Sequence, residues 1–163
     1  MKCFECGQQL VESRETVRDH RLGLDNVVLQ NVPVRRCKKC GTREIMYPQI
    51  ASLHKLIANV LIHKKTRLTG NEVRFLRKYL GWSSADLARR LAVAPATVSR
   101  WENAREPIGV VPDRAIRLMV TTRQPVASYP IEDFLDALTT DEPQPTPLEV
   151  EVEDTGYRLL SAS

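Results

Sequence analysis

Every cysteine in the chain lies in one of two Cys-x-x-Cys pairs, formed by Cys3 with Cys6 and by Cys37 with Cys40. A two-residue gap lets one tight turn direct two sulfurs at the same ion, and a tetrahedral metal needs four such ligands. Gly7 and Gly41 follow the pairs and permit the positive φ that closes each turn. Because four thiolates fill the coordination sphere, we expect one structural Zn²⁺ with no catalytic role.

Three other uses of these cysteines fit the same spacing. A rubredoxin-like iron site has the same pairs, and paired cysteines also form disulfides or redox dithiols. Structural disulfides require an oxidising compartment, but no signal peptide precedes Cys3 and no apolar run reaches the length of a membrane span. We therefore expect a cytoplasmic protein without a membrane partner, with zinc favoured and iron as the alternative metal.

Charge is distributed unevenly along the chain. Residues 1–122 contain 22 Lys and Arg against 11 Asp and Glu, whereas residues 123–163 contain 2 against 9. A basic body suits a polyanionic partner such as nucleic acid, although a merely solvated basic surface has the same composition. The acidic extension can shield that surface, fold against it or keep the protein in solution.

Residues 84–103 have the pattern of a helix-turn-helix. Apolar residues stand where two crossing helices would touch, at Leu87, Leu91, Val93, Val98 and Trp101. Ala88 supplies the small side chain needed where the helix backbones approach. Ala92 occupies the turn position that usually holds glycine, and a positive φ there would cost about 1 kcal/mol. A helical hairpin without a role in DNA binding is the alternative interpretation.

The second helix of this motif, from Pro95 to Asn103, is expected to lie in the major groove with its N-terminal residues over base edges. Arg100 is the strongest candidate for base readout, because a guanidinium can donate two hydrogen bonds to guanine O6 and N7. The alternative for Arg100 is a surface ion pair with Glu102 or Glu106. We expect Glu102 to bond within the domain.

The remaining predicted DNA contacts have small or polar side chains. Ala96 and the methyl group of Thr97 suit thymine methyl groups. Ser84, Ser99 and Asn103 suit phosphate oxygens, as does the amino end of the first helix of the motif.

The cysteine pairs belong to a predicted first domain, residues 1–66. Its strands are expected from Leu10 to Asp19 and from Asn26 to Val34, followed by a helix from Pro48 that ends near His63. A zinc ribbon of this size buries little apolar surface. The metal should therefore supply much of its folding free energy, on the order of 10 kcal/mol.

The predicted second domain, residues 67–122, is entirely helical. Thr69 and Glu72 form a capping box, Gly81 ends that helix, Ser83 or Ser84 caps the next one, and a last helix runs from Asp113 to Val120. The predicted fold class is thus α+β, a small four-cysteine zinc-ribbon β domain followed by an all-α, lambda-repressor-like helix-turn-helix domain.

Residues 123–163 form a predicted acidic C-terminal extension. Ile131 to Leu138 has the pattern of a short amphipathic helix. Leu148, Val150 and Val152 alternate with acidic residues, which is typical of a strand. The end of the chain therefore predicts either a hairpin or a segment that adds to the edge of another sheet.

Residues 97–103, with Leu87 to Leu91 upstream, resemble the lambda-repressor-like, Xre class of helix-turn-helix domains. A zinc ribbon, a helix and an Xre-like domain in this order resemble the MqsA family of antitoxins, over about residues 1–122. The resemblance implies a homodimer formed mainly through the DNA-binding half, a palindromic operator and repression of its own promoter. It also implies that the zinc domain binds a cognate toxin, usually a small mRNA-cleaving ribonuclease.

Two positions depart from that family. Its recognition helix typically has asparagine where this chain has Ala96, so the operator sequence should differ. The extension after Thr122 is longer than the family's core, which leaves room for an additional contact or a regulatory role.

We therefore predict a sequence-specific transcriptional repressor that is the zinc-containing antitoxin of a type II toxin–antitoxin pair. The alternatives are a stand-alone transcriptional regulator without a toxin, and a zinc-ribbon protein that binds another protein and uses its helices as a scaffold. We expect no enzyme and no catalytic residues, since nothing resembles a nucleophile–base pair or a phosphate-cradling glycine loop.

Overall fold

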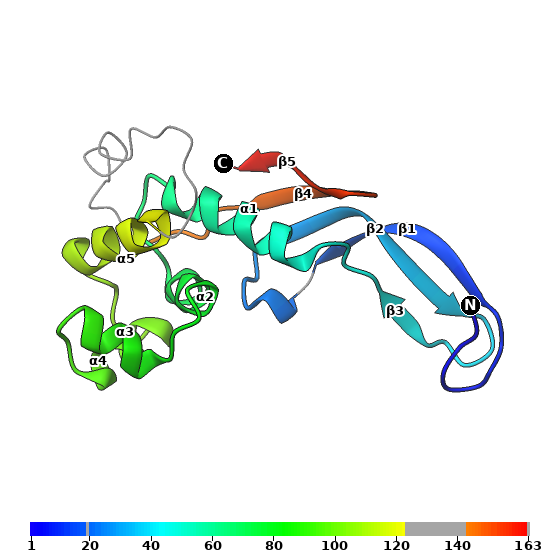
Figure 1. Cartoon of the computed structure of the whole chain (residues 1–163), viewed down its shortest axis with the longest axis horizontal. Helices are drawn as coiled ribbons and strands as arrows, with labels where there is room; N and C mark the ends of the chain where they lie inside the picture. Colours follow the sequence, from blue (N-terminus) through cyan, green and yellow to red (C-terminus); the bar gives the residue numbers. More distant parts are fainter. Residues whose placement is uncertain (19, 123–142, 163) are drawn as a thin grey trace. The chain divides into compact units, whose positions relative to one another are not determined.

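The structure is a computed structural model that describes residues 1–18, 20–122 and 143–162. Within these residues it combines five α-helices with one five-stranded sheet, a mixed α/β architecture (Figure 1). The predicted helix at Ile131 to Leu138 lies outside the described residues.

The chain divides into two compact units. The first comprises Met1–Asp19, Asp25–Leu53 and Pro147–Ser163, and the second comprises His20–Leu24 and His54–Thr146. The C-terminal residues therefore fold with the cysteine pairs, although residues 54–146 of the second unit separate them in the sequence.

The first unit contains the sheet, with strands β1 (Leu10–Arg18), β2 (Val27–Cys37), β3 (Arg43–Ile45), β4 (Leu148–Glu153) and β5 (Gly156–Ala162). Strand β1 pairs antiparallel with β2 along most of its length. The other edge of β2 is shared, because β4 pairs parallel with its first half and β3 pairs antiparallel with its second half. Strand β5 pairs antiparallel with β4, so the order is β1-β2-β4-β5 with β3 beside β2 (Figure 1).

Three residues of β2, Asn31 to Pro33, separate the pairings of β4 and β3. Asn31 has a φ of 58°, a left-handed conformation that asparagine tolerates better than most residues. Its side-chain Nδ2 donates a hydrogen bond to the carbonyl of Val152 at 2.9 Å. Pro33 has no N–H to donate, and its carbonyl accepts from the backbone N–H of Met46 at 3.0 Å. The edge of β2 thus changes partner between Gln30 and Val34.

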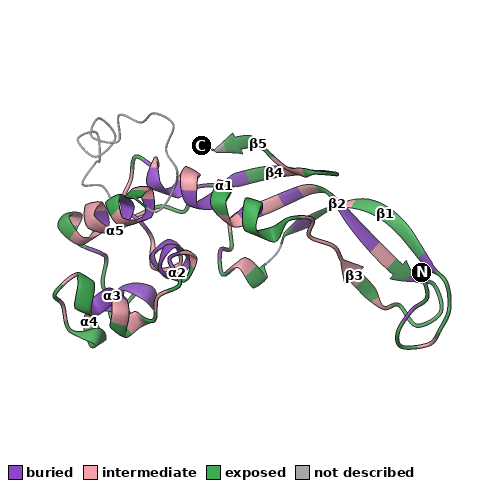
Figure 2. Cartoon of the chain, viewed as in Figure 1, coloured by how far each residue is buried: buried purple, intermediate pink, exposed green. Residues whose placement is uncertain are grey.

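Strands β2 and β4 together build an aliphatic core (Figure 2). The side chains at most 1% exposed are Val27, Leu29, Val32 and Val34 of β2 and Leu148, Val150 and Val152 of β4. The last segment of the chain is therefore both a hairpin and an addition to another sheet edge. Because β4 contributes three fully buried side chains, the first unit buries more apolar surface than its N-terminal strands would alone.

The second unit contains a short 3-10 helix, η1 (His20–Leu22), and most of the α-helical residues. The helices are α1 (Ile50–Ile62), α2 (Gly70–Tyr79), α3 (Ser84–Arg90), α4 (Pro95–Glu102) and α5 (Val110–Thr122). Helix α5 begins earlier than predicted, because Pro112 lies in its first turn, where a missing N–H is tolerated. None of the described helices has the length and apolar character needed to cross a membrane.

The helix caps follow the sequence closely. Thr69 and Glu72 form the predicted capping box at the start of α2, and Ser83 forms a second one with Asp86 at the start of α3. Gly81 has a φ of 73° directly after the C-cap of α2. These local signals therefore set the helix boundaries around the predicted helix-turn-helix.

A buried charged network joins α1, α2 and α5 within the second unit. The Arg117 guanidinium is 1% exposed and donates to Asp113 Oδ1 at 2.8 Å. It also caps the end of α1 by donating to the carbonyls of Leu61, Ile62, Lys64 and Thr66. Lys64 Nζ donates to Glu72 Oε2 at 2.7 Å, and Glu72 Oε1 accepts from the backbone N–H of Thr146 at 3.3 Å. The basic stretch after α1 is thus fixed by internal hydrogen bonds.

Candidate metal centre and candidate nucleic-acid interface

The two cysteine pairs adopt the same local structure. In each pair the first cysteine donates its backbone N–H to the residue five positions later, Gln8 at 2.8 Å or Thr42 at 2.9 Å. The carbonyl of the same cysteine accepts from Gly7 at 2.9 Å or Gly41 at 3.0 Å. Both glycines have positive φ, 71° and 74°, as the spacing predicts. Sequence and backbone geometry therefore agree that the two turns are equivalent and that each is suited to binding a metal.

The four sulfurs converge on one point of the first unit. Their Sγ atoms all lie within 4.8 Å of one another, with Cys3 to Cys40 at 3.5 Å and Cys6 to Cys37 at 3.4 Å. Sulfurs bound tetrahedrally to zinc at about 2.3 Å would be roughly 3.8 Å apart, so the cluster fits one ion. All four cysteines are free thiols, which disagrees with the disulfide alternative.

Backbone and side-chain donors around the sulfurs favour thiolates at two positions. The backbone N–H of Cys40 lowers the pKa of Cys37, and the hydroxyl and then the N–H of Thr42 lower the pKa of Cys40. At Cys6 a backbone hydrogen bond from Gln8 acts in the same direction, but bonds to neighbouring thiols and burial outweigh it and raise the pKa to about 12. A divalent cation would remove this opposition, because metal-bound thiols are deprotonated.

The sequence did not identify Thr42 as part of this centre. Its Oγ1 lies 3.0 Å from Cys40 Sγ. The only sequence signal is its position directly after Gly41, at the end of the second turn.

In the second unit, α4 is fixed to α2 by a buried ion pair. The Glu102 carboxylate is 6% exposed and accepts two hydrogen bonds from Arg77, at 2.5 and 3.0 Å. Arg74 Nη2 donates to the backbone carbonyl of Glu102 at 2.7 Å. The prediction that Glu102 bonds within the domain is confirmed, whereas Arg74 and Arg77 had no distinguishing signal in the sequence.

Gly70 allows the start of α2 to approach the end of α4. A Cβ at Gly70 would lie 2.3 Å from the backbone oxygen of Trp101, a distance that side chains do not adopt. Only glycine permits this approach, and it adds a second constraint on the position of α4.

Helices α3 and α4 are connected by a tight turn in which Ala92 has a φ of 53°. Leu87, Ala88, Val98 and Trp101 are buried, as expected of residues between two crossing helices. Leu91 and Val93, predicted to fill the same contact, are only half-buried. The positive φ at Ala92 places an alanine where glycine would be less strained.

The residues predicted to contact DNA lie on α4 and at the start of α3. Ala96, Ser99, Arg100 and Asn103 are exposed, and Ser84 and Thr97 are half-buried. The side chain of Asn103 is engaged within the protein, since its Nδ2 donates to the Ser99 carbonyl at 2.8 Å and its Oδ1 accepts from Arg74 at 2.9 Å. Asn103 therefore closes the end of α4 in this structure.

Arg100 takes part in the ion pair that its sequence neighbourhood suggested. Its Nε donates to Glu106 Oε2 at 2.8 Å, and its Nη2 donates to Thr97 Oγ1 at 3.0 Å. The Arg100 and Glu106 side chains are each 47% exposed. Of the two acids considered as its partner, Glu106 holds the guanidinium, while Glu102 is bound to Arg77.

Further arginines surround this part of the second unit. Arg89, Arg90 and Arg105 are exposed, and the Arg90 guanidinium lies 4.3 Å from the centre of the Trp82 ring. A stacked guanidinium keeps its charge available at the surface with restricted motion. The Arg89 guanidinium forms an ion pair with Asp86 of the same helix at 2.5 Å.

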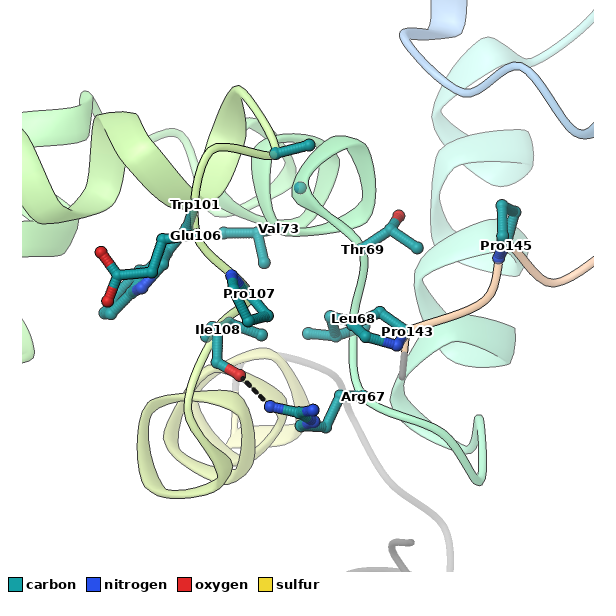
Figure 3. A pocket seen from close by; sticks show the side chains of 12 residues that line it. Arg67, Leu68, Thr69, Val73, Trp101, Glu106, Pro107, Ile108, Pro143 and Pro145 are labelled. Atoms are coloured by element: carbon teal, nitrogen blue, oxygen red, sulfur yellow. Dashed lines mark hydrogen bonds between the residues drawn. The ribbon is translucent and has the colours of Figure 1, made fainter. Parts of the chain in front are cut away.

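A cavity of about 440 Å³ lies in the second unit beside the end of α4 (Figure 3). Trp101, Ala104 and Glu106 line one side, and Pro143 and Pro145 line it from the C-terminal segment. Arg67 and Ile108 also line the cavity, and Arg67 Nη1 donates to the Ile108 carbonyl at 3.0 Å (Figure 3). The cavity therefore adjoins the loop that contains Glu106.

Comparisons of the chain with protein-family models, with curated proteins and with solved structures found no match.

Proposed function

We propose that this protein is a sequence-specific DNA-binding transcriptional repressor with one structural Zn²⁺. The observation that carries the proposal is the exposed face of α4, with Ala96, Ser99 and Arg100 at the surface of a helix whose opposite side is buried. A rigidly held helix with a polar outer face is what major-groove readout requires. The buried pair of Glu102 with Arg77 supports this, because it holds α4 on α2.

The net charge of residues 54–122, which include α2 to α5 of the second unit, also supports a polyanionic partner. Residues 54–122 contain 13 Lys and Arg against 5 Asp and Glu. Three of these acids are buried at Glu72, Glu102 and Asp113, and Asp86 is committed to the capping box of α3. Lys64, Arg77 and Arg117 neutralise the three buried acids, so the charge that remains on residues 54–122 is mainly positive.

The four-cysteine cluster supports zinc as the metal, in a role that is structural. Four thiolates leave no open coordination position, and no vacant ligand site is needed for DNA binding. Metal analysis of the purified protein distinguishes zinc from iron.

A homodimer on a palindromic operator is part of this proposal. Helix α5 exposes Val111 (78%) and Leu118 (42%), which are two helical turns apart and therefore on the same side of the helix. In this proposal a second copy covers these apolar side chains, and readout of a palindrome requires the two α4 helices to lie about one DNA turn apart.

The resemblance to MqsA antitoxins supports a cognate toxin as a further partner, with the repressor controlling its own operon. A stand-alone regulator is the alternative. Co-purification with the product of the neighbouring gene distinguishes the two, because an antitoxin should retain a small toxin in stoichiometric amount.

The test of the main proposal is selection from a randomised duplex pool with the full-length, zinc-loaded chain. The expected result is a two-fold symmetric sequence bound with a steep salt dependence. Recovery of no preferred sequence, or binding that is insensitive to salt, would contradict DNA recognition by α4.

A further inference from the structure

Glu106 differs from every other acid in residues 54–122. The other four are buried or form a helix cap, whereas the Glu106 side chain is 47% exposed and forms an ion pair with Arg100. An acid beside an arginine proposed to read DNA reduces the attraction of that arginine to phosphate. Its presence is therefore better explained by a role other than general affinity for DNA.

The backbone brings Glu106 back to Arg100 after α4 ends. Ala104 has a φ of 54°, and the Arg105 backbone N–H donates to the Arg100 carbonyl at 2.9 Å. This reversal directs the chain along the last turn of α4. Glu106 and the buried Trp101 then line the same cavity wall (Figure 3).

The two hydrogen bonds of Arg100 use some of its five N–H donors and leave others. Nε is used by Glu106 and one N–H of Nη2 by Thr97, which within the described residues leaves both N–H groups of Nη1 and one of Nη2. A pair of donors on neighbouring nitrogens is what guanine O6 and N7 accept. The guanidinium is therefore held at Nε and Nη2, while Nη1 keeps both of its N–H groups for another acceptor.

We propose that Glu106 is a positioning residue that sets the base specificity of Arg100. This inference rests on the proposed function. Glu106 acts in two ways: it fixes the orientation of the guanidinium, and its charge weakens complexes in which Arg100 contacts phosphate instead of a base. The chain thus loses some affinity for all DNA and gains discrimination at one base pair.

The experiment measures Kd at fixed salt for the duplex selected by the wild type, for each single-base-pair variant of it and for a scrambled duplex. The proteins are wild type, Glu106→Ala, Glu106→Gln, Arg100→Ala and the Arg100→Ala/Glu106→Ala double variant. Glu149→Gln, at an exposed position of β4, is the control for loss of one negative charge.

For Glu106→Ala we expect tighter binding to the scrambled duplex, by about threefold, and discrimination reduced by about tenfold at one base pair only. Glu106→Gln should bind the scrambled duplex as tightly as Glu106→Ala does but keep the part of the discrimination that depends on orientation, because its amide oxygen still accepts from Nε. The double variant should discriminate no worse than Arg100→Ala alone. Glu149→Gln should discriminate as the wild type does.

Unchanged discrimination in Glu106→Ala overturns the inference, and so does a uniform loss at all base pairs, which is the mark of a purely structural role. In both cases a wild type that selects a sequence and is weakened by Arg100→Ala leaves the proposed function standing. A wild type that selects no sequence overturns both.

Discussion

Arg77 and Glu102 share two hydrogen bonds, at 2.5 and 3.0 Å, and side-chain exposures of 10% and 6% leave them almost out of water. Arg77 lies on α2 and Glu102 on α4, so the pair joins the helix proposed to read DNA to the body of its unit. Removing one partner would leave the other as an uncompensated buried charge.

Glu102→Ala should therefore destabilise the second unit by about 3–5 kcal/mol. Denaturant unfolding followed by circular dichroism measures this change. Glu5→Ala removes an exposed carboxylate and should change the unfolding free energy by less than about 0.5 kcal/mol. Equal changes in unfolding free energy for the two variants would mean that the buried pair does not stabilise the packing of α4 on α2.

Ala92→Gly should stabilise the protein by about 1 kcal/mol, because glycine adopts the observed φ of 53° without steric cost. The matched control is Ala115→Gly in the middle of α5, which should instead cost about 1 kcal/mol. Thermal unfolding of both variants checks the opposite signs. A destabilising Ala92→Gly would show that the turn is not strained.

Loss of the metal should unfold only part of the first unit. Cys3, Leu10 and Cys37 form a small buried cluster of their own, whereas the side chains of β2 and β4 form the aliphatic core. In Cys37→Ser, hydrogen exchange should accelerate in residues 1–11 and 36–43 while residues 27–34 and 148–153 stay protected. Exchange that becomes fast in all four segments would mean that the metal supports the whole unit.

Glu15 should make the first unit sensitive to acid. Hydrogen bonds from Arg36, with weaker help from Ser13 and Arg43, lower the pKa of Glu15 from 4.5 to about 2. Since the folded state favours the carboxylate, this contribution to stability is complete above pH 4.5 and disappears as the pH falls toward about 2.

The stability difference between wild type and Glu15→Gln should accordingly be largest near neutral pH and shrink below pH 4.5. Denaturant unfolding over that pH range measures it. Glu12→Gln, which removes a more exposed ion pair with Arg35, should have the smaller effect. A Glu15→Gln difference that stays constant with pH would contradict the lowered pKa.

Local interactions explain what could be predicted for the second unit. Thr69 with Glu72, Gly81 and Pro95 specify helix ends through residues at most a turn away, and each lies where the sequence indicated. The sequence offered Glu106 as one of two partners for Arg100, but it did not indicate Arg77 as the partner of Glu102. Nothing in the sequence around Arg77 distinguishes it from the other arginines, and only the packing of α2 on α4 brings it to Glu102.

The amino-acid sequence by itself specified the conformation of the two cysteine turns, because the hydrogen bonds that close each Cys-x-x-Cys-Gly segment join residues at most five positions apart. It also determined the helix caps, for the same reason. Only the tertiary structure decided where β4 pairs, since an alternating strand can join any open sheet edge and β2 had one free beside β3. The same holds for the placement of Glu106 beside Arg100, which depends on the chain reversal after α4.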